Sequence, residues 1–366
     1  MTLAPTPPAE RDAAIDVLRG AALFGVLLEN LQHFTRPTWV ELVASDAATA
    51  ADRLGLGAVR MLCDNKVYLL FAFLFGYGIA LQMLRDARGG SSFVTLHLWR
   101  MVGLFLIGLV NLTMWTGDIL TTYAVLGCLL LPLRRRPDAT LARFAGLLLL
   151  APGLAVAGLA AASRSLPWSP AEIGAAVAGL LYPLRQGCYS LAAFVLGLAA
   201  GRRRLLSREA MPARAGRALP LALGIGLSGN LAFAAIEARA PAPLSWAAVA
   251  REATLAVAAP ALALAAALLV LRWARARAGA GLRGPLAAVG RTTLSNYLLQ
   301  SAIGVGIVSR LGPIHPPVAL LLTLAVFGAE LAASALCLAR FRFGPVEWLW
   351  RSLAYGRIEP MREALR

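Results

Sequence analysis

A series of long apolar runs constrains this sequence more than any other feature. The hydrocarbon core of a bilayer is about 30 Å thick, and roughly 20 consecutive apolar residues form a helix that crosses it. Runs of about this length recur along the whole chain. They lie roughly at 15–34, 66–84, 98–115, 119–133, 141–162, 172–200, 218–238, 247–271, 285–308 and 316–339. We therefore expect an all-α, polytopic integral membrane helical bundle with about ten transmembrane helices.

The composition excludes most other classes of protein. Hydrophobic residues make up 59% of the 366 residues and charged residues 15%, whereas about one quarter of a soluble domain is charged. The scattered cysteines and histidines predict neither a metal site nor a disulfide framework. The net charge of +16 comes from short arginine clusters between the apolar runs. Such clusters are typical of loops at an anionic membrane surface, so we expect no nucleic-acid partner.

The distribution of basic residues predicts the orientation. With a cytoplasmic N-terminus, most Lys and Arg residues fall on the inner side of alternating helices, as the positive-inside rule requires. We therefore expect a multi-pass protein of the plasma (inner) membrane with both termini inside. Its parts would be a cytoplasmic tail at 1–14, a transmembrane helical domain at 15–340 and a cytoplasmic amphipathic segment at 341–366. Pro183 and Arg185 interrupt the sixth run, where the sequence allows the helix to break.

Polar side chains at membrane depth mark candidate functional positions, since each is costly unless it is paired or hydrated. Asp16, Arg19, Gly20 and Asn30 share one face of the first expected helix on a 3.6-residue period, and His33 lies one turn beyond Asn30. This face predicts a polar stripe directed at other helices. The alternative is that Asp16 caps the helix and Arg19 reaches the inner headgroups.

A second cluster opens the next apolar run. Lys66 follows Asp64, and Gly76 and Gly78 lie further along the expected helix. Glycines at these positions let another backbone or a narrow ligand chain approach closely. Packing of small residues between helices is the alternative reading.

A third cluster lies on the third apolar run and after it. Arg100 and Asn111 lie on the expected helix, Asp118 lies in the short turn that follows, and Tyr123 opens the next helix. These residues are expected to face a site. The alternative is that Asp118 caps the fourth helix and that Tyr123 anchors it at the membrane interface.

The densest cluster comprises Arg291, Ser295, Asn296, Gln300 and Ser301. A helix that faces lipid does not tolerate this density of polar groups, so the face must meet protein, water or ligand. Two further isolated charges, at positions 185 and 330, are expected to pair with each other or with these groups. We expect the polar side chains of separate spans to converge on one hydrated cavity that opens toward the cytoplasm.

Several of these clusters together resemble a known family. Asp16-x-x-Arg19-Gly20 followed by Asn30 resembles the opening of the transmembrane acyltransferase superfamily. Within it, the chain resembles the YeiB-like family (domain of unknown function 418) from about residue 12 to residue 353. The motifs that carry this resemblance are Asn65-Lys66 with Leu74-Phe75-Gly76-x-Gly78, Gly117-Asp118 with Tyr123, Gly290-Arg291 through Ser295-Asn296 to Gln300, and Gly344-Pro345-x-Glu347 with Trp350-Arg351.

The resemblance implies transfer of an acyl group from cytoplasmic acyl-CoA to an acceptor at the outer face, with no covalently bound cofactor. On this reading, arginines at the inner surface hold the nucleotide phosphates, and the amide and hydroxyl groups stabilise the thioester oxygen. The catalytic candidates are His33, Asn30 and Asp118. The binding candidates are Asp16, Arg19, Gly20, Lys66, Gly76, Gly78, Arg100, Asn111, Tyr123, Arg291, Ser295, Asn296 and Gln300.

One departure from the relatives bears on catalysis. Acyltransferases of the wider superfamily often have histidine at the position of Asn30, and many YeiB-like sequences have it at the position of Asn111. Neither amide can act as a general base, so the sequence also leaves other functions open. A transporter or exporter of a small or lipidic solute is one, and a non-catalytic membrane subunit is another. The expected partners are the lipid bilayer, acyl-CoA and an envelope acceptor, and a homo-oligomer stays open.

Overall fold

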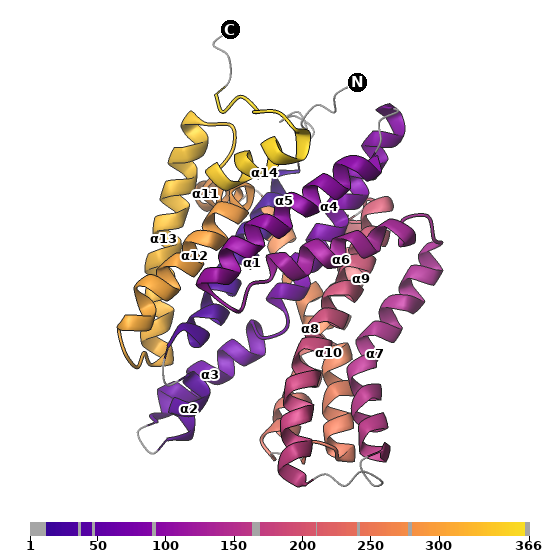
Figure 1. The fold of residues 1–366 in the computed structure, drawn as a ribbon, viewed down its shortest axis with the longest axis vertical. Coiled ribbons are helices and arrows are strands. Elements are labelled where there is room, and N and C mark those ends of the chain that lie inside the picture. The colour runs from indigo at the N-terminus through magenta and orange to yellow at the C-terminus, as the bar shows by residue number, and fades with distance from the viewer. Residues whose placement is uncertain are drawn as a thin grey trace. The chain divides into compact units, whose positions relative to one another are not determined.

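The fold is known from a computed structural model that describes residues 12–35, 38–45, 48–89, 93–162, 169–209, 211–239, 242–276 and 280–362. Every regular element among these residues is a helix (Figure 1). The helices are α1 (Ala13–Phe34), α2 (Trp39–Ala44), α3 (Ala50–Leu62), α4 (Val67–Gly89), α5 (Phe93–Met114), α6 (Leu120–Leu133), α7 (Asp138–Ala162), α8 (Pro170–Arg202), α9 (Met211–Glu237), α10 (Trp246–Arg275), α11 (Ala280–Arg291), α12 (Thr293–Gly306), the 3-10 turn η3 (Val308–Arg310), α13 (Pro316–Arg340) and α14 (Pro345–Tyr355).

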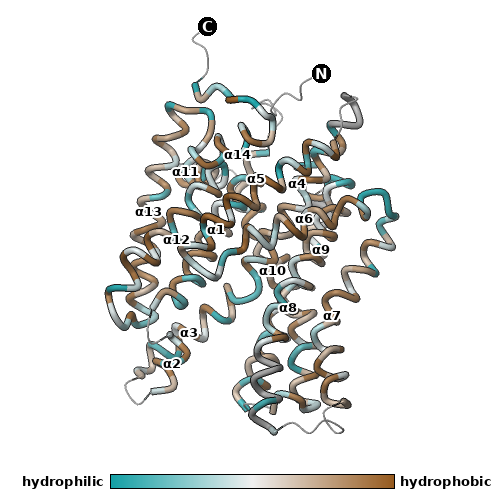
Figure 2. The backbone as a smooth tube through the Cα atoms, viewed as in Figure 1, coloured by the Kyte–Doolittle hydropathy of each residue, from teal (hydrophilic) through white to brown (hydrophobic). Residues whose placement is uncertain are grey.

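Helices suited to a bilayer dominate the chain. In the described residues, six helical stretches are long and apolar enough to cross a membrane: Ala50–Arg85, Phe93–Met114, Asp138–Ala162, Ala215–Glu237, Trp246–Arg275 and Pro316–Arg340. Figure 2 shows hydrophobic residues along most of the helices and hydrophilic ones mainly at ends and turns. The expectation of a polytopic helical membrane protein is therefore confirmed, while the count of about ten spans and the inside termini stay predictions.

Helix α13 has an apolar side that is exposed and a polar side that is buried in the protein. Leu321 and Leu336 are 67% and 65% exposed, whereas Glu330 and Ser334 are 1% and 3% exposed. Polar side chains thus point into the protein and leucines point out of it. This is the reverse of a helix at the surface of a soluble protein and is the arrangement that contact with lipid requires.

The chain forms two compact units, and each combines segments that are distant in sequence. Unit 1 comprises Met1–Val67, Arg85–Cys128 and Leu269–Arg366. In it, α1 packs closely on α11 and α13, and α14 packs on α5 and α12. Gly20 and Gly290 allow the α1–α11 contact, because a Cβ on either would meet backbone atoms of the other helix. Phe24 stacks edge-on against Phe327 of α13, with ring centroids 5.2 Å apart.

Unit 2 comprises Tyr68–Leu84 and Leu129–Leu268. It contains most of α4 together with α7, α8, α9 and α10, and α7 and α8 pack along each other. The core around α8 includes Phe194, which is fully buried and stacks on Phe75 with ring centroids 5.0 Å apart. The Asn230 amide donates hydrogen bonds to the Gly226 and Ala258 carbonyls at 2.7 and 3.2 Å, which joins α9 to α10.

For two of the expected helices, the structure decides a point that the sequence left open or predicted incorrectly. The sixth run does not break at Pro183, because α8 continues from Pro170 to Arg202. Packed neighbours tolerate a proline in a membrane helix, and Pro152 and Pro260 also lie inside helices. The ninth run, expected as one helix, is two: α11 and α12 meet at Thr292, whose φ of −111° and ψ of 33° are not helical.

Candidate functional site

The polar face of α12 makes three different sets of contacts within unit 1. The Asn296 amide, 5% exposed, donates to the hydroxyls of Thr292 at 3.0 Å and Ser334 at 2.9 Å. The Thr292 hydroxyl also lies 2.9 Å from the Ser334 hydroxyl. This triangle joins the break between α11 and α12 to α13. It uses both amide hydrogens of Asn296, so this side chain positions helices rather than presenting a donor to a substrate.

One turn further along α12, Gln300 contacts a carboxyl group of α13. The Gln300 Nε2 donates to Glu330 Oε2 at 3.0 Å, and each residue is only 1% exposed. The sequence left the partner of Glu330 open, and the structure assigns it to Gln300. The amide oxygen of Gln300, Oε1, and the other carboxyl oxygen of Glu330, also Oε1, are buried without a hydrogen-bond partner in the described part of the chain.

The first turn of α12 is capped by a carboxylate from α14. Glu347 accepts hydrogen bonds from the backbone N–H of Leu294 at 2.6 Å and of Ser295 at 3.1 Å. The Ser295 hydroxyl donates to the other carboxylate oxygen at 2.6 Å. Thr292 makes no side-chain cap of its own. Burial raises the pKa of Glu347, while the hydrogen bonds from Ser295 and Leu294 act in the opposite direction. A carboxylate at a helix N-terminus is favourable, so Glu347 of α14 acts as the N-terminal cap that α12 does not supply from its own residues.

The turn between α5 and α6 holds a second polar group of unit 1. The Asn111 amide donates to Asp118 Oδ1 at 2.8 Å, and Asp118 Oδ2 accepts the backbone N–H of Thr121 at 2.8 Å. Asp118 therefore caps α6, as the alternative reading of the sequence expected. The Tyr297 hydroxyl of α12 accepts the Ile119 N–H at 3.2 Å. Tyr123 is buried one turn into α6.

Basic candidates from three helices gather at one end of unit 1. Arg19 pairs with Asp16 at 3.0 Å, and the Asp16 carbonyl lies against Gly290, next to Arg291. Asp16 does not cap α1, because Asp12 is the N-cap and accepts the Ala14 N–H.

The α14 region extends this group. Arg291 is exposed and donates to the Arg342 carbonyl at 3.3 Å. The Arg100 guanidinium lies 4.7 Å from the centroid of the Trp350 ring, and Trp350 Nε1 donates to the Arg100 carbonyl at 2.7 Å. The guanidinium of Arg351 lies 4.5 Å from the centroid of the Phe343 ring. We call Arg19, Arg100, Arg291, Arg342 and Arg351 the basic end of unit 1.

The catalytic candidates lie at the opposite end of the same helices. Phe34, next to His33, contacts Trp115 with ring centroids 4.9 Å apart and also lies against Gly304 of α12. These contacts bring the last turn of α1 to the turn that carries Asp118. We call Asn30, His33, Asn111 and Asp118 the far end of unit 1. His33 is exposed there, and Asn30 is partly buried.

Lys66 belongs to a separate polar group beside α1. Its side chain is 4% exposed, and its Nζ donates to the Arg60 carbonyl at 2.7 Å. Glu29 lies close to Lys66 and Asp64 and accepts the backbone N–H of Asn65. Asn65 has a φ of 62°, a left-handed turn that asparagine tolerates. Lys66 is thus paired within unit 1 but does not join the polar face of α12.

Gly76 and Gly78 lie in unit 2. A Cβ on Gly76 would meet the backbone carbonyl of Phe194, and a Cβ on Gly197 would meet that of Phe73. Reciprocal glycines therefore set the contact between α4 and α8, which is the packing alternative named for Gly76.

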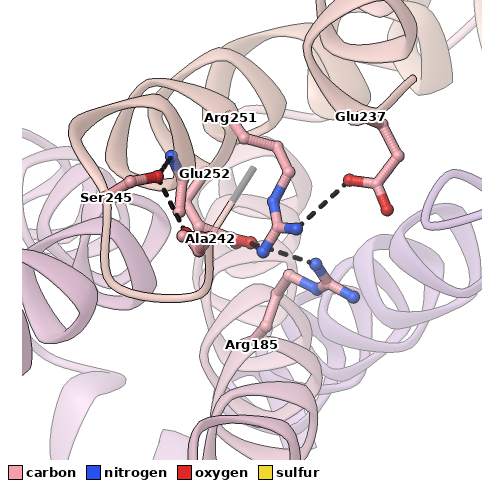
Figure 3. A network of polar contacts seen from close by, with 7 residues as sticks. Arg185, Glu237, Ala242, Ser245, Arg251 and Glu252 are labelled. Atoms are coloured by element: carbon pink, nitrogen blue, oxygen red, sulfur yellow. Dashed lines mark hydrogen bonds and ion pairs between the residues drawn. The ribbon is translucent and has the colours of Figure 1, made fainter. Parts of the chain in front are cut away.

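The sequence did not anticipate a charged network in unit 2 (Figure 3). Glu252 of α10, 2% exposed, accepts Arg185 of α8 at 3.3 Å and Arg251 at 3.1 Å. Arg251 also pairs with Glu237 at 3.2 Å, so it lies between two carboxylates (Figure 3). The partner of Arg185 is thus Glu252. Helical periodicity identifies faces but not which distant faces meet, so no signal in the sequence joined these residues.

The basic end of unit 1 gathers guanidinium groups, and no metal-binding cluster is found among the described residues. Within the described ranges, no group of three or more His, Cys, Asp or Glu side chains is placed to hold a metal ion. Guanidinium groups at one end offer bidentate donors for phosphate or carboxylate. Ser334 and Glu347 are the residues of this region whose contacts were missed. Ser334 carried no signal beyond a polar residue in an apolar helix, and Glu347 was named only within the family motif that begins at Gly344, which says nothing of its contact with α12.

A family model matches the C-terminal part of the chain, and curated relatives match nearly all of it. A family model described as "Protein of unknown function (DUF418)" matches residues 200–357. The chain is 30% identical over 410 residues to "Uncharacterized protein YxaH" of Bacillus subtilis (strain 168), which covers 98% of both chains. It is 28% identical over 385 residues to "Uncharacterized protein YeiB" of Escherichia coli (strain K12), covering 96% of this chain and 98% of the relative. No solved structure matches the chain significantly.

Proposed function

We propose, since the chain belongs to the DUF418 family, that it is a membrane-embedded acyltransferase. It would take an acyl group from cytoplasmic acyl-CoA and transfer it to an acceptor at the outer face. The placement of the family in the transmembrane acyltransferase superfamily is part of this proposal and rests on the sequence motifs of α1, α4 and α12. The described helices supply the membrane setting that transfer across a bilayer requires.

One observation carries the proposal: two helices of unit 1, α1 and α5, each have a basic residue toward one end and a polar candidate toward the other. Helix α1 carries Arg19 and His33, and α5 carries Arg100 and Asn111. Helix α12 begins after Arg291 and ends against Phe34. A ligand with phosphates at one end and a thioester at the other could place its phosphates at the basic residues and its thioester at the polar candidates. Arg19 and His33 are 14 residues apart, or about 21 Å along a helix of 1.5 Å rise.

The residues divide the work in this proposal. Arg19 and Arg291 contact the phosphates, and Arg100 is held by Trp350 at the same end. The Ser295 hydroxyl and the Asn296 amide hold α12 against α14 and α13, so they position the helix. His33 is the candidate general base at the far end, because an imidazole titrates near neutral pH. Asp118 is held as the cap of α6 and the acceptor of Asn111, and it orients that turn.

Binding of acyl-CoA to the purified full-length protein tests the first step. A charge-assisted hydrogen bond to phosphate contributes about 1.5–3 kcal/mol, which corresponds to roughly 10- to 150-fold in affinity. Arg19→Ala and Arg291→Ala are each expected to weaken binding by at least about tenfold on this basis. Arg239→Ala, which removes an exposed charge of unit 2, is the matched control and leaves the affinity unchanged. Isothermal titration with acetyl-CoA and a long-chain acyl-CoA measures both.

Transfer itself is tested with labelled acyl-CoA added to proteoliposomes and to envelope preparations. The proposal expects slow hydrolysis or transfer that His33→Ala reduces without changing the binding of acyl-CoA. It is wrong if the protein neither binds nor hydrolyses any acyl-CoA and if Arg19→Ala and Arg291→Ala leave envelope acylation unchanged. Stable co-purification with one partner under those conditions would instead indicate a non-catalytic subunit.

Transport of a small or lipidic solute is the second candidate, and one observation favours it. The break at Thr292 makes α11 and α12 a discontinuous pair, and interrupted helices commonly form the substrate site of a transporter. Counterflow of labelled solutes in proteoliposomes tests this function. Exchange that Gln300→Ala abolishes, with no affinity for acyl-CoA, would replace the acyltransferase proposal.

A further inference from the structure

Gln300 and Glu330 form a buried pair whose hydrogen bonds are incomplete as long as Glu330 is ionised. The Gln300 Nε2 donates to Glu330 Oε2 at 3.0 Å, and both side chains are 1% exposed. Gln300 Oε1 and Glu330 Oε1 are buried without a donor in the described part of the chain. An ionised carboxylate accepts hydrogen bonds but donates none. As long as Glu330 is ionised, Gln300 Oε1 and Glu330 Oε1 therefore both stay without a hydrogen bond.

A single proton on Glu330 corrects this deficit. A carboxylic acid has one O–H donor and one C=O acceptor, and a primary amide has N–H donors and one C=O acceptor. The two groups are therefore complementary: the amide N–H donates to one carboxyl oxygen, and the carboxyl O–H donates to the amide oxygen. The protonated form also removes a charge from a helix interior where an unpaired ion is costly.

The surroundings of Glu330 supply no opposite charge. Helix α13 packs against α1, α3, α11 and α12. The ionisable side chains described on those helices are Asp16, Arg19, Glu29, His33, Asp52, Arg53, Arg60, Arg283, Tyr297 and Arg291. Asp16 pairs with Arg19 at 3.0 Å, and Asp52 pairs with His315 at 2.9 Å. Among the residues that the structure describes, the environment of the Glu330 carboxyl is set by its burial and by the hydrogen bond from the Gln300 amide, and no charged side chain contributes to it.

We propose that Gln300 and Glu330 form a proton-binding site at membrane depth, in which Glu330 is neutral and donates its O–H to Gln300 Oε1. The site is independent of the acyltransferase proposal, because it needs neither acyl-CoA nor an acceptor. Loss of the proton to water leaves a carboxylate and removes one of the two hydrogen bonds between α12 and α13. The protonation state of Glu330 thus sets how firmly these two helices are joined.

Infrared spectroscopy of the full-length protein tests the proposal directly. A protonated carboxyl has a C=O stretching band that a carboxylate lacks. The difference between wild type and Glu330→Gln at neutral pH is expected to contain one such band. Gln300→Leu is expected to keep the band and to move it to higher frequency, because the carboxyl loses its amide partner. Glu237→Gln, which alters a carboxylate with 42% side-chain exposure, is the control and removes no protonated band.

A stability series provides a second, independent readout. Glutamine at position 330 again offers one donor and one acceptor, so Glu330→Gln is expected to unfold within a few degrees of wild type, whereas Glu330→Ala unfolds earlier. The exchanged variant Gln300→Glu/Glu330→Gln is expected to regain the protonated band.

Two results would overturn the proposal. One is the absence of any protonated-carboxyl band that depends on Glu330, with the shift in Gln300→Leu also absent. The other is a melting temperature of wild type that rises with Na⁺ or K⁺ and loses this dependence in Glu330→Gln. The second result would assign the two oxygens to a monovalent cation.

Discussion

The two units satisfy their buried polar groups in different ways. In unit 2, a buried carboxylate forms ion pairs: Glu252 lies 3.3 Å from Arg185 and 3.1 Å from Arg251. Unit 1 joins α12 to α13 through amide, hydroxyl and carboxyl groups, as in the contact of Asn296 with Ser334 at 2.9 Å. An ion that loses its counterion leaves a charge that must be solvated, whereas a neutral group that loses its partner leaves one hydrogen bond unmade. Removing one partner from the Glu252 network of unit 2 should therefore cost more than removing one partner from the contact between α12 and α13 of unit 1.

The largest effect is expected for Glu252→Gln. Removing one partner of a buried ion pair costs about 3–5 kcal/mol because the other charge stays buried. Here Arg185 loses its carboxylate partner, whereas Arg251 keeps Glu237. Unfolding of the detergent-solubilised protein, followed by circular dichroism, measures the change. Glu237→Gln is the matched control, since Glu237 contacts the same Arg251 but has 42% side-chain exposure; an exposed pair contributes about 0–1 kcal/mol. Equal losses in the two variants would contradict the comparison.

Glycine contacts are expected to respond alike in both units. A Cβ at Gly197 of unit 2 or at Gly290 of unit 1 would meet a backbone carbonyl of the neighbouring helix. Gly197→Ala and Gly290→Ala should each cost about 1–3 kcal/mol, the usual penalty for overpacking. Gly187 on α8 and Gly284 on α11 have open space around the same position, and alanine there should be neutral or stabilising by up to about 1 kcal/mol. A large difference between Gly197→Ala and Gly290→Ala would show that the units differ in packing and not only in charge.

The smallest effect is expected for Ser334→Ala. It removes the contacts of Ser334 with Asn296 and with the Thr292 hydroxyl, whereas Asn296 keeps its contact with Thr292 at 3.0 Å and Thr292 keeps its contact with the Ala288 carbonyl at 3.0 Å. Hydrogen bonds between membrane helices contribute about 0.6 kcal/mol on average and up to about 1.7. The same unfolding assay should therefore place this variant well below Glu252→Gln. A loss as large as that of the ionic variant would mean that the neutral network is as critical as the charged one.

The sequence predicts the helices well because apolar length is a local property. The ends of α13 lie within a residue of the expected run, and the cap of α6 by Asp118 follows from a turn of a few residues. The sequence left open whether the helix breaks at Pro183, because the tolerance of a proline depends on the neighbours of the helix, and α8 is continuous there. The break at Thr292 was missed because the side chain that caps the N-terminus of α12 is Glu347, which lies more than fifty positions later in the sequence.

Prediction of the candidate site had the same limit: local properties follow from the sequence, whereas contacts between distant segments do not. The density of polar residues predicted that this face of α12 meets protein, water or ligand and not lipid, and Asn296 and Gln300 are both buried. It did not give the partners of that face. The contacts with Ser334, Glu330 and Glu347 depend on how α13 and α14 dock, and docking is decided by side-chain packing between distant segments. The roles assigned to His33, Lys66 and the arginines in acyl transfer stay predictions.

The position of Glu347 has a consequence for the order in which the protein is made. The first amides of α12 receive their acceptor from a helix that the ribosome synthesises about fifty residues afterwards. Until α14 emerges, the start of α12 has only water or headgroup oxygens to accept those protons. Assembly of this part of the protein is thus finished from the C-terminal side, and a nascent chain released before Pro345 would contain α12 without the carboxylate that caps its N-terminus.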